Sequence, residues 1–269
     1  MPHKQVTILV PNYKTPEITK ICLRLLRKHT NPNLADVVVI DNNSQDESLD
    51  YLRQLDWIKL IERESIQGET GVQAHSRALD LALKEVKTPF VVSIHTDTFI
   101  RRDDWLETLL GQFDNPAIAG IGSWKLEHKS RPRQIGISFE QSWKFVLNKL
   151  FGYKRYNPNR LNYDARYLRS HCAMYRMDVI NKLGTNFSDG DTTAGKEMHF
   201  KMCAAQYEMK FLSSSFLGQY LMHLNHATSV LNPHLRRSGQ INHKEYKKIM
   251  KQLDAIDAHR ILSDDSLDK

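Results

Sequence analysis

A carboxylate that follows an apolar run is the first feature of this sequence that could do chemistry. Residues 90–98 read Phe-Val-Val-Ser-Ile-His-Thr-Asp-Thr, so Asp97 comes directly after a segment typical of a central parallel strand. Ligands of open α/β sheets bind beyond the carboxyl ends of such strands, where a carboxylate can hold a metal-bound phosphate. Capping of the following helix is the alternative role for Asp97. The pattern indicates an enzyme that handles phosphate groups.

Three further polar segments should meet Asp97 at the same edge of the sheet. Pro11-Asn12-Tyr13 follows a predicted strand over residues 6–10, and Asp41-Asn42-Asn43 follows one over residues 37–40. The third segment is the Gly-containing loop and helix start at residues 68–77. Because the carboxyl ends of parallel strands lie along one edge, we expect these segments to line one crevice.

The elements that position these residues alternate along the first half of the chain. Apolar runs predict strands at 6–10, 37–40, 58–61, 90–94 and 117–121, and stripes with helical spacing separate most of them. Such alternation predicts an α/β fold with a mostly parallel, twisted sheet flanked by helices.

Helix starts are predicted from capping residues. Thr15 before Pro16 is a suitable N-cap, Ser44 with Glu47 forms a capping-box pattern, and Asp103 or Asp104 should cap a later helix. These residues therefore set the expected starts of three helices.

Composition restricts the class of protein. A chain of 269 residues with 41% hydrophobic content can form one large α/β domain. Its formal charge of +7 favours anionic partners, such as nucleotides, sugar phosphates, a lipid surface or nucleic acid. Cys22, Cys172 and Cys203 are odd in number and widely spaced, so we expect core residues and neither disulfides nor a zinc site. With no apolar leader and no run of about 20 apolar residues, we expect a cytoplasmic protein.

The second half of the chain is less regular. Basic and aromatic residues alternate over 125–169, which suits a sugar-bearing or anionic ligand and equally suits a solvated helix pair with aromatic anchors. Residues 241–256 predict an amphipathic helix that packs on the body, with contact to the inner membrane surface as the alternative. We expect a frayed tail over 263–269.

The ordered motifs resemble glycosyltransferase family 2, the inverting nucleotide-sugar transferases of the A-type fold. The resemblance rests on residues 6–17 with the Pro-x-Tyr turn, residues 37–46, and residues 94–97 at the position of an Asp-x-Asp strand end, and it weakens after residue 104. It implies transfer of a sugar from a UDP-, GDP- or dTDP-sugar to a sugar, glycan or lipid-linked acceptor, as in polysaccharide or glycoconjugate synthesis. It also implies a divalent cation, Mn²⁺ or Mg²⁺. No nucleic acid partner is expected, and a homo-oligomer is compatible with the sequence.

The resemblance also implies roles for individual residues. Asp41 would accept hydrogen bonds from the base, and Tyr13 would pack beside it. Asp97 would bind the cation, together with a late histidine, His223 or His226. Glu197 would be the general base, with Asp191 as the second candidate. The complete nucleotide-binding set is Pro11, Asn12, Tyr13, Asp41, Asn43, Gly71, Arg77, His95 and Thr96.

Departures from the family pattern leave alternatives open. His95 replaces the first acidic residue of the Asp-x-Asp pair, and Met198 stands where a carboxylate is usual. A catalytically weakened nucleotide-sugar-binding protein is therefore the alternative function, and a basic nucleic-acid-binding protein is a weaker one. We expect a nucleotide-sugar-binding half over 1–123, an acceptor-binding and catalytic half over 124–240, and an amphipathic C-terminal helix and tail over 241–269.

Overall fold

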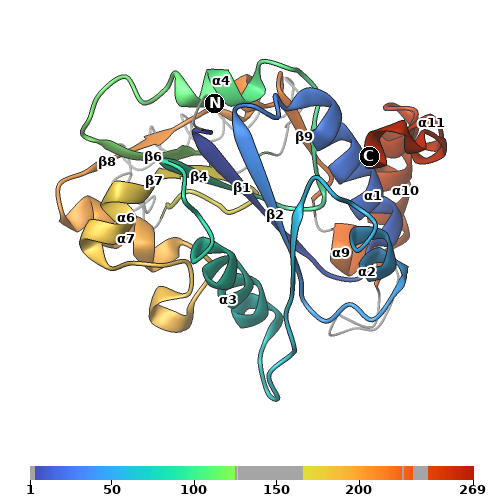
Figure 1. The fold of residues 1–269 in the computed structure, drawn as a ribbon, viewed down its shortest axis with the longest axis horizontal. Helices are drawn as coiled ribbons and strands as arrows, with labels where there is room; N and C mark the ends of the chain where they lie inside the picture. The colour runs from blue at the N-terminus through green and yellow to red at the C-terminus, as the bar shows by residue number, and fades with distance from the viewer. Residues whose placement is uncertain (1–3, 125, 127–165, 226, 233–241) are drawn as a thin grey trace, which may run out of the picture.

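A seven-stranded sheet forms the centre of the protein (Figure 1). The computed structural model describes residues 4–124, 126, 166–225, 227–232 and 242–269. The sheet has the order β3-β2-β1-β4-β7-β6-β8. Its strands are β1 (Val6–Asn12), β2 (Ala35–Asp41), β3 (Lys59–Glu62), β4 (Phe90–Ile94), β6 (Ile118–Gly122), β7 (Cys172–Arg176) and β8 (Glu208–Phe211).

The strand directions confirm the mostly parallel sheet. β1 pairs in parallel with β2 and β4, β2 with β3, and β6 with β8. Only β7 runs against its neighbours, β4 and β6, within the described part of this sheet. Because β7 is antiparallel to both, the end of β6 and the start of β7 lie at the edge where β4 ends, with Ile94 opposite Cys172 and Gly122 opposite Ala173.

Helices cover both faces of the sheet because side chains of each strand alternate between them. Ile8 and Val10 of β1 pack in a core with α1 (Pro16–His29) and α2 (Glu47–Leu52). Leu9 points to the opposite core, beneath α3 (Gly71–Leu83), α6 (Met177–Leu183) and α7 (Lys196–Ala204). Figure 1 shows α1 and α3 on opposite sides of the strands. The fold is thus the three-layer α/β arrangement expected from the alternation.

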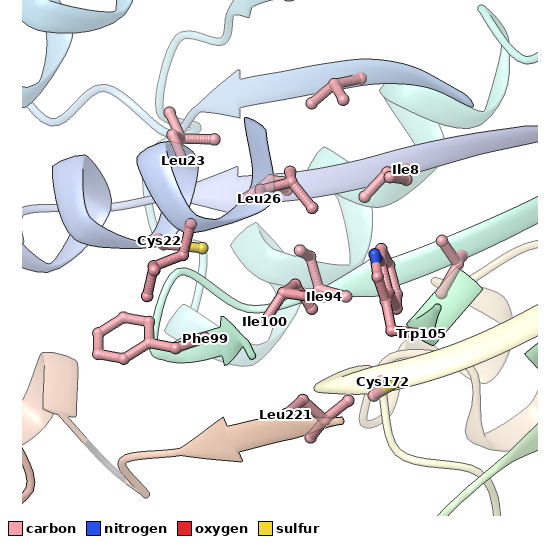
Figure 2. Packing of buried hydrophobic residues seen from close by; sticks show 14 of the residues in the cluster. Ile8, Cys22, Leu23, Leu26, Ile94, Phe99, Ile100, Trp105, Cys172 and Leu221 are labelled. Carbon is pink, nitrogen blue, oxygen red and sulfur yellow. The ribbon is translucent and has the colours of Figure 1, made fainter. Parts of the chain in front are cut away.

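A second, two-stranded sheet joins distant parts of the chain. β5 (Thr98–Ile100) pairs antiparallel with β9 (Leu221–His223). Phe99 and Ile100 are fully buried and lie with Cys22 and Leu221 in the core that includes Trp105 of α4 (Trp105–Leu110) (Figure 2). Two short helices flank β9, α8 (Ser214–Leu217) and α9 (Ala227–Leu231).

The C-terminal segment is docked on the body. α10 (His243–Asp254) and α11 (Ala258–Ser263) are followed by a 3₁₀ turn, Asp265–Asp268. Arg24 of α1 is 2% exposed, forms an ion pair with Asp268, and donates to the carbonyls of Ile261 and Leu262. The expectation of a frayed tail is therefore wrong, because a buried guanidinium requires these acceptors.

Several local expectations differ from the structure. α2 is capped by Asp46, which accepts from the backbone N–H of Ser48, because the Ser44 hydroxyl is bound to Asp41. Thr15 does precede α1, but its side chain forms no capping hydrogen bond. Cys22 and Cys172 are buried as expected, whereas Cys203 is exposed on α7. None of the described helices is long and apolar enough to cross a membrane.

Two sequence interpretations lie largely or wholly outside the described residues. Of the basic and aromatic segment 125–169, the structure describes residues 126 and 166–169. His226 is also outside the described residues.

Candidate active site

A pocket of about 510 Å³ opens at the carboxyl edge of β1, β2 and β4. Three of the four sequence segments contribute expected residues to it: Pro11, Asn12, Tyr13, Gly71, His95, Thr96 and Asp97. The fourth segment, Asp41-Asn42-Asn43, contributes Asn42, which is not among the expected residues. The remaining lining residues are Arg63, Ser65, Ile66, Glu69, Ala74, His75 and Thr228. The four segments therefore meet at one edge, as the order of strands requires.

Asp41 lies beneath the pocket wall and is not among the residues that line it. It is 1% exposed and accepts hydrogen bonds from Asn12 Nδ2 at 2.7 Å and from the hydroxyl and backbone N–H of Ser44 at 2.5 and 2.9 Å. Asn12 is fully buried and also receives the hydroxyl of Thr19 at 2.7 Å. This network fixes the ends of β1 and β2 against each other. Asn43 lies outside the pocket lining and donates to Ser65.

Arg77 and its neighbours form a charged network beside the pocket. Glu69 pairs with Arg63 at 2.5 Å and with Arg77 at 3.1 Å, and Arg63 also donates to Asn42. Arg77 does not line the pocket; its second partner is Asp191 at 3.4 Å. Arg63 and Glu69, which the sequence did not single out, are the charged pair that faces the cavity.

Asp97, His95 and His223 bring their ligand atoms within 4.8 Å of one another. Asp97 Oδ1 lies 3.1 Å from His223 Nε2 and 3.8 Å from His95 Nδ1. The pairing of β5 with β9 creates this arrangement, since it sets Thr98 opposite His223. One carboxylate oxygen and two imidazole nitrogens are a donor set that suits a divalent transition metal.

Contacts behind the cluster orient each group. Asp97 Oδ2 accepts the backbone N–H of Ala227 at 3.3 Å, which leaves Oδ1 toward the histidines. His223 Nδ1 lies 2.8 Å from Asn225 Oδ1, and His95 Nε2 lies 3.0 Å from Ser170 Oγ. With a cation bound, these outer nitrogens would be the donors and the inner nitrogens would present lone pairs to the ion beside Asp97 Oδ1. Three convergent acceptors fit a cation.

Burial sets the protonation of the surrounding groups. It lowers the pKa of His75 to about 4 and that of His171 to about 3, so both rings are neutral near pH 7. Burial also holds the pKa of His95 well below its usual value. Burial opposes the ionisation of Asp97, but His223, His95 and the Ala227 N–H outweigh it and hold the pKa of that carboxyl below its usual range.

The two candidate bases lie in one loop and helix start. Asp191 ends the 3₁₀ turn Asp189–Asp191, and its half-exposed carboxylate accepts from Gln73 Nε2 at 2.6 Å. Glu197 is in the first turn of α7 and packs against Gly190, where an added Cβ would lie 2.4 Å from Glu197 Cγ. Neither residue lines the pocket, but Asp191 contacts α3, the helix that contributes Gly71, Ala74 and His75 to it.

Three residues around the cluster could not be identified from local sequence patterns. His75, Ser170 and His171 come from α3 and from the turn before β7, and the fold brings them to His95 and His223. The His171 and His223 rings stack with centroids 5.0 Å apart, and those of His75 and His95 are 4.8 Å apart. Their only sequence sign is that His171 immediately precedes an apolar strand.

Sequence comparison agrees with this geometry. The model of glycosyl transferase family 2 matches residues 7–184, which include β1 to β7 and most of the pocket. The chain belongs to glycosyltransferase family 2. No curated protein has a significant sequence match to it.

Solved structures of similar fold extend the comparison. They include the mannosyltransferase PcManGT from Pyrobaculum calidifontis in complex with GDP-Man and Mn²⁺ (TM-score 0.52, 17% identity, 77% of this chain and 54% of that one). S. aureus TarS 1–349 has a TM-score of 0.53, with 14% identity over 96% of this chain and 69% of that one. Glucosyl-3-phosphoglycerate synthase from Mycobacterium tuberculosis, in complex with Mn²⁺, UDP and its product, has a TM-score of 0.50, with 14% identity over 87% and 77%.

These similarities confirm the A-type glycosyltransferase fold for this family 2 chain. The chain spans about half the length of the PcManGT chain that it matches.

Proposed function

We propose that this protein transfers a sugar from a nucleoside diphosphate sugar to an acceptor hydroxyl, with inversion and with the help of a divalent cation. The observation that supports this most directly is the convergence of Asp97, His95 and His223 beside a pocket of about 510 Å³ at the sheet edge. A pocket of this size suits a ligand as large as a nucleotide.

The donor set supports Mn²⁺ or Mg²⁺ as the cation. Asp97 Oδ1, His95 Nδ1 and His223 Nε2 would hold it, and the two imidazole nitrogens favour Mn²⁺ over Mg²⁺. When bound, the cation would neutralise charge on the diphosphate as the nucleotide leaves. The similar structures of PcManGT and the M. tuberculosis synthase both contain Mn²⁺. His95 thus supplies a ligand where the family pattern has a carboxylate.

The rest of the pocket is proposed to hold the nucleotide. Tyr13 and Pro11 offer apolar surface for a base, and Asn42 with Arg63 offers polar groups at the same wall. Asp41 would act from behind, because it holds Asn12 and Ser44 in place. Gly71 has open space where a Cβ would be, so the start of α3 can approach the ligand closely.

The geometry favours Asp191 over Glu197 as the general base. Asp191 accepts a hydrogen bond from Gln73 of α3, whose first turn lines the pocket, whereas Glu197 is packed against Gly190. In a single displacement the base takes the proton of the acceptor hydroxyl while that oxygen attacks the anomeric carbon, which inverts the centre. Hydrogen bonding by Gln73 would orient the Asp191 carboxylate for this role.

The proposed acceptor is a sugar, glycan or lipid-linked sugar, in polysaccharide or glycoconjugate synthesis at or near the cytoplasmic membrane surface. The net charge of +7 supports work near anionic donors and surfaces. Lysines and an exposed Tyr246 on α10 are compatible with such a surface.

A thermal-shift panel tests this function. UDP, GDP, dTDP and their sugar conjugates are each measured with and without Mn²⁺; a ligand at 100 times its dissociation constant stabilises by about 2.7 kcal/mol. We expect one base to stabilise strongly, and only with Mn²⁺. Donor hydrolysis with Mn²⁺ then separates an enzyme from a protein that only binds nucleotide sugars. Absence of any Mn²⁺-dependent shift would contradict the proposal.

A further inference from the structure

The Ser170 hydroxyl joins two histidines from different elements. Its Oγ lies 3.0 Å from His95 Nε2 and 3.1 Å from His75 Nε2, and Ser170 is 7% exposed. Among the described residues, these two nitrogens are the side-chain partners of the hydroxyl. A hydroxyl has one hydrogen to donate, so at most one ring accepts it and at least one ring donates to the oxygen; if the hydroxyl hydrogen stays within this trio, one ring has each role.

The proposed cation site determines which ring donates to Ser170 and which ring accepts from it. His95 Nδ1 faces Asp97 Oδ1 at 3.8 Å, too far for a hydrogen bond, and belongs to the convergent set of ligand atoms. A ligand nitrogen must present its lone pair, so the proton of the neutral His95 ring is on Nε2. His95 then donates to Ser170, and Ser170 donates to His75 Nε2.

This order leaves a donor on the other nitrogen of His75. With Nε2 as an acceptor, the neutral ring has its proton on Nδ1. No described residue forms a hydrogen bond with that Nδ1, and His75 lines the pocket with its ring centroid 4.8 Å from that of His95. An oxygen of a bound ligand is the natural acceptor for this N–H.

We propose that Ser170 is a positioning residue that sets the tautomers of two histidines, so that His95 presents a lone pair to the cation and His75 presents an N–H to an oxygen of the nucleoside diphosphate sugar. The inference rests on the proposed function. It adds His75 to the donor-binding residues and couples cation binding to donor binding through one hydroxyl.

Cation binding alone tests the first half. Free Mn²⁺ is measured by EPR in titrations of wild type, Ser170→Ala, Ser170→Thr and Ser93→Ala. Loss of a group that orients a metal ligand weakens metal affinity by about 10–100-fold, so we expect this for Ser170→Ala, with recovery in Ser170→Thr. Ser93→Ala is the matched control, because Ser93 is also a buried serine, two residues before His95, but its hydroxyl contacts a backbone carbonyl. Affinity of Ser170→Ala within threefold of wild type would overturn the inference.

Two isosteric variants test the second half. His75→Asn keeps an N–H near the Nδ1 position, and His75→Gln keeps a polar group near Nε2 but loses the pocket-facing donor. A hydrogen bond to a charged group is worth about 1.5–3 kcal/mol, so His75→Gln should weaken Mn²⁺-dependent binding of the stabilising nucleotide or its sugar conjugate by about 10-fold or more. His75→Asn should stay within threefold. Equal losses in both variants, or no loss in either, would overturn the role of His75.

Histidine tautomers can be read directly. In ¹⁵N spectra of the Mg²⁺-loaded protein, we expect the proton of His95 on Nε2 and that of His75 on Nδ1, and the reverse pattern would refute the proposal. Failure of the proposed function would give a different result, because wild type itself would then show no binding of Mn²⁺ or nucleotide. If wild type binds Mn²⁺ and the nucleotide, and the Ser170 and His75 variants bind them as well as wild type does, the proposed function stands and this inference falls.

Discussion

His223 Nε2 lies 3.1 Å from Asp97 Oδ1, although the two residues are far apart in the sequence. β5 begins immediately after Asp97 and β9 ends at His223, so their pairing sets this distance. The proposed cation site therefore depends on the small sheet for His223, while the pocket lies at the edge of the large one.

Asp97→Asn should abolish most Mn²⁺ binding and Mn²⁺-dependent transfer while the fold is retained. The amide keeps the shape of the side chain but removes the only anionic ligand of the set, and Asp97 is the buried centre of the cluster. Chelation of the metal from wild type should give the same loss. The measurements are EPR titration, turnover at limiting Mn²⁺, and circular dichroism. The exposed Asp103→Asn is the control; unchanged turnover in Asp97→Asn would exclude the metal assignment.

Asp191→Asn should lower turnover by about 10²–10⁴-fold with donor affinity near wild type, because a general base is lost while the Gln73 contact can remain. Glu197→Gln should stay within a few-fold. Steady-state kinetics at saturating donor and acceptor compare the two variants. The opposite ranking would make Glu197 the base, as the family pattern implies.

Asp41→Ala should weaken both stability and nucleotide binding. Asn12 and Ser44 would each lose an acceptor in a buried place, which costs about 1–3 kcal/mol for each unsatisfied group. Donor KM should rise because Asn12, which lines the pocket next to Tyr13, is held by this network. Urea unfolding and donor titration measure the two effects, with Asn43→Ala, outside the pocket lining, as control. A stability loss without a change in donor KM would limit Asp41 to a structural role.

Asp268→Asn should lower the free energy of unfolding by about 3 kcal/mol, because removal of one partner leaves the buried Arg24 guanidinium without its counter-charge. Burial alone would raise the pKa of the Asp268 carboxyl, but hydrogen bonds from Arg24 and Tyr51 outweigh it and lower the pKa. Its contribution to stability is therefore complete above the unfolded pKa of about 3.9 and is lost as pH falls through the folded value.

Urea unfolding of wild type and Asp268→Asn from pH 3 to pH 8 measures this dependence. The difference between them should be constant above about pH 5 and shrink toward pH 3. Asp265→Asn, exposed in the same turn, should match wild type throughout. A difference that grows at low pH would show that the pair does not stabilise the native state.

Sequence reasoning succeeded where signals were local. Strand ends such as Asn12 and Thr96 could be placed at one edge because β-branched runs and the order of strands determine where chain segments emerge. The reversed direction of β7 could not be read in this way, since a short apolar run such as residues 172–176 has the same pattern in either direction.

The other wrong or missed predictions concern residues whose interaction partners depend on the folded chain. Ser44 fits a capping box by spacing, but Asp41 is only three residues away and takes its hydroxyl. The tail after Ser263 lacks apolar residues at helical spacing, yet Asp268 finds a buried cation on α1. The histidines around His95 are separated by long stretches of sequence, so only the folded chain shows that they meet.

The pairing of β5 with β9 has a consequence for synthesis of the chain. As residues leave the ribosome in order, β1, β2 and β4, whose carboxyl ends form the pocket edge, emerge before residue 95, and β9 emerges more than a hundred residues later. A nascent chain that has folded its first strands thus still lacks His223 and the cation site. Metal binding at the proposed site is therefore expected only after translation has passed β9, and in pulse-labelling experiments it would mark the docking of β9 on β5.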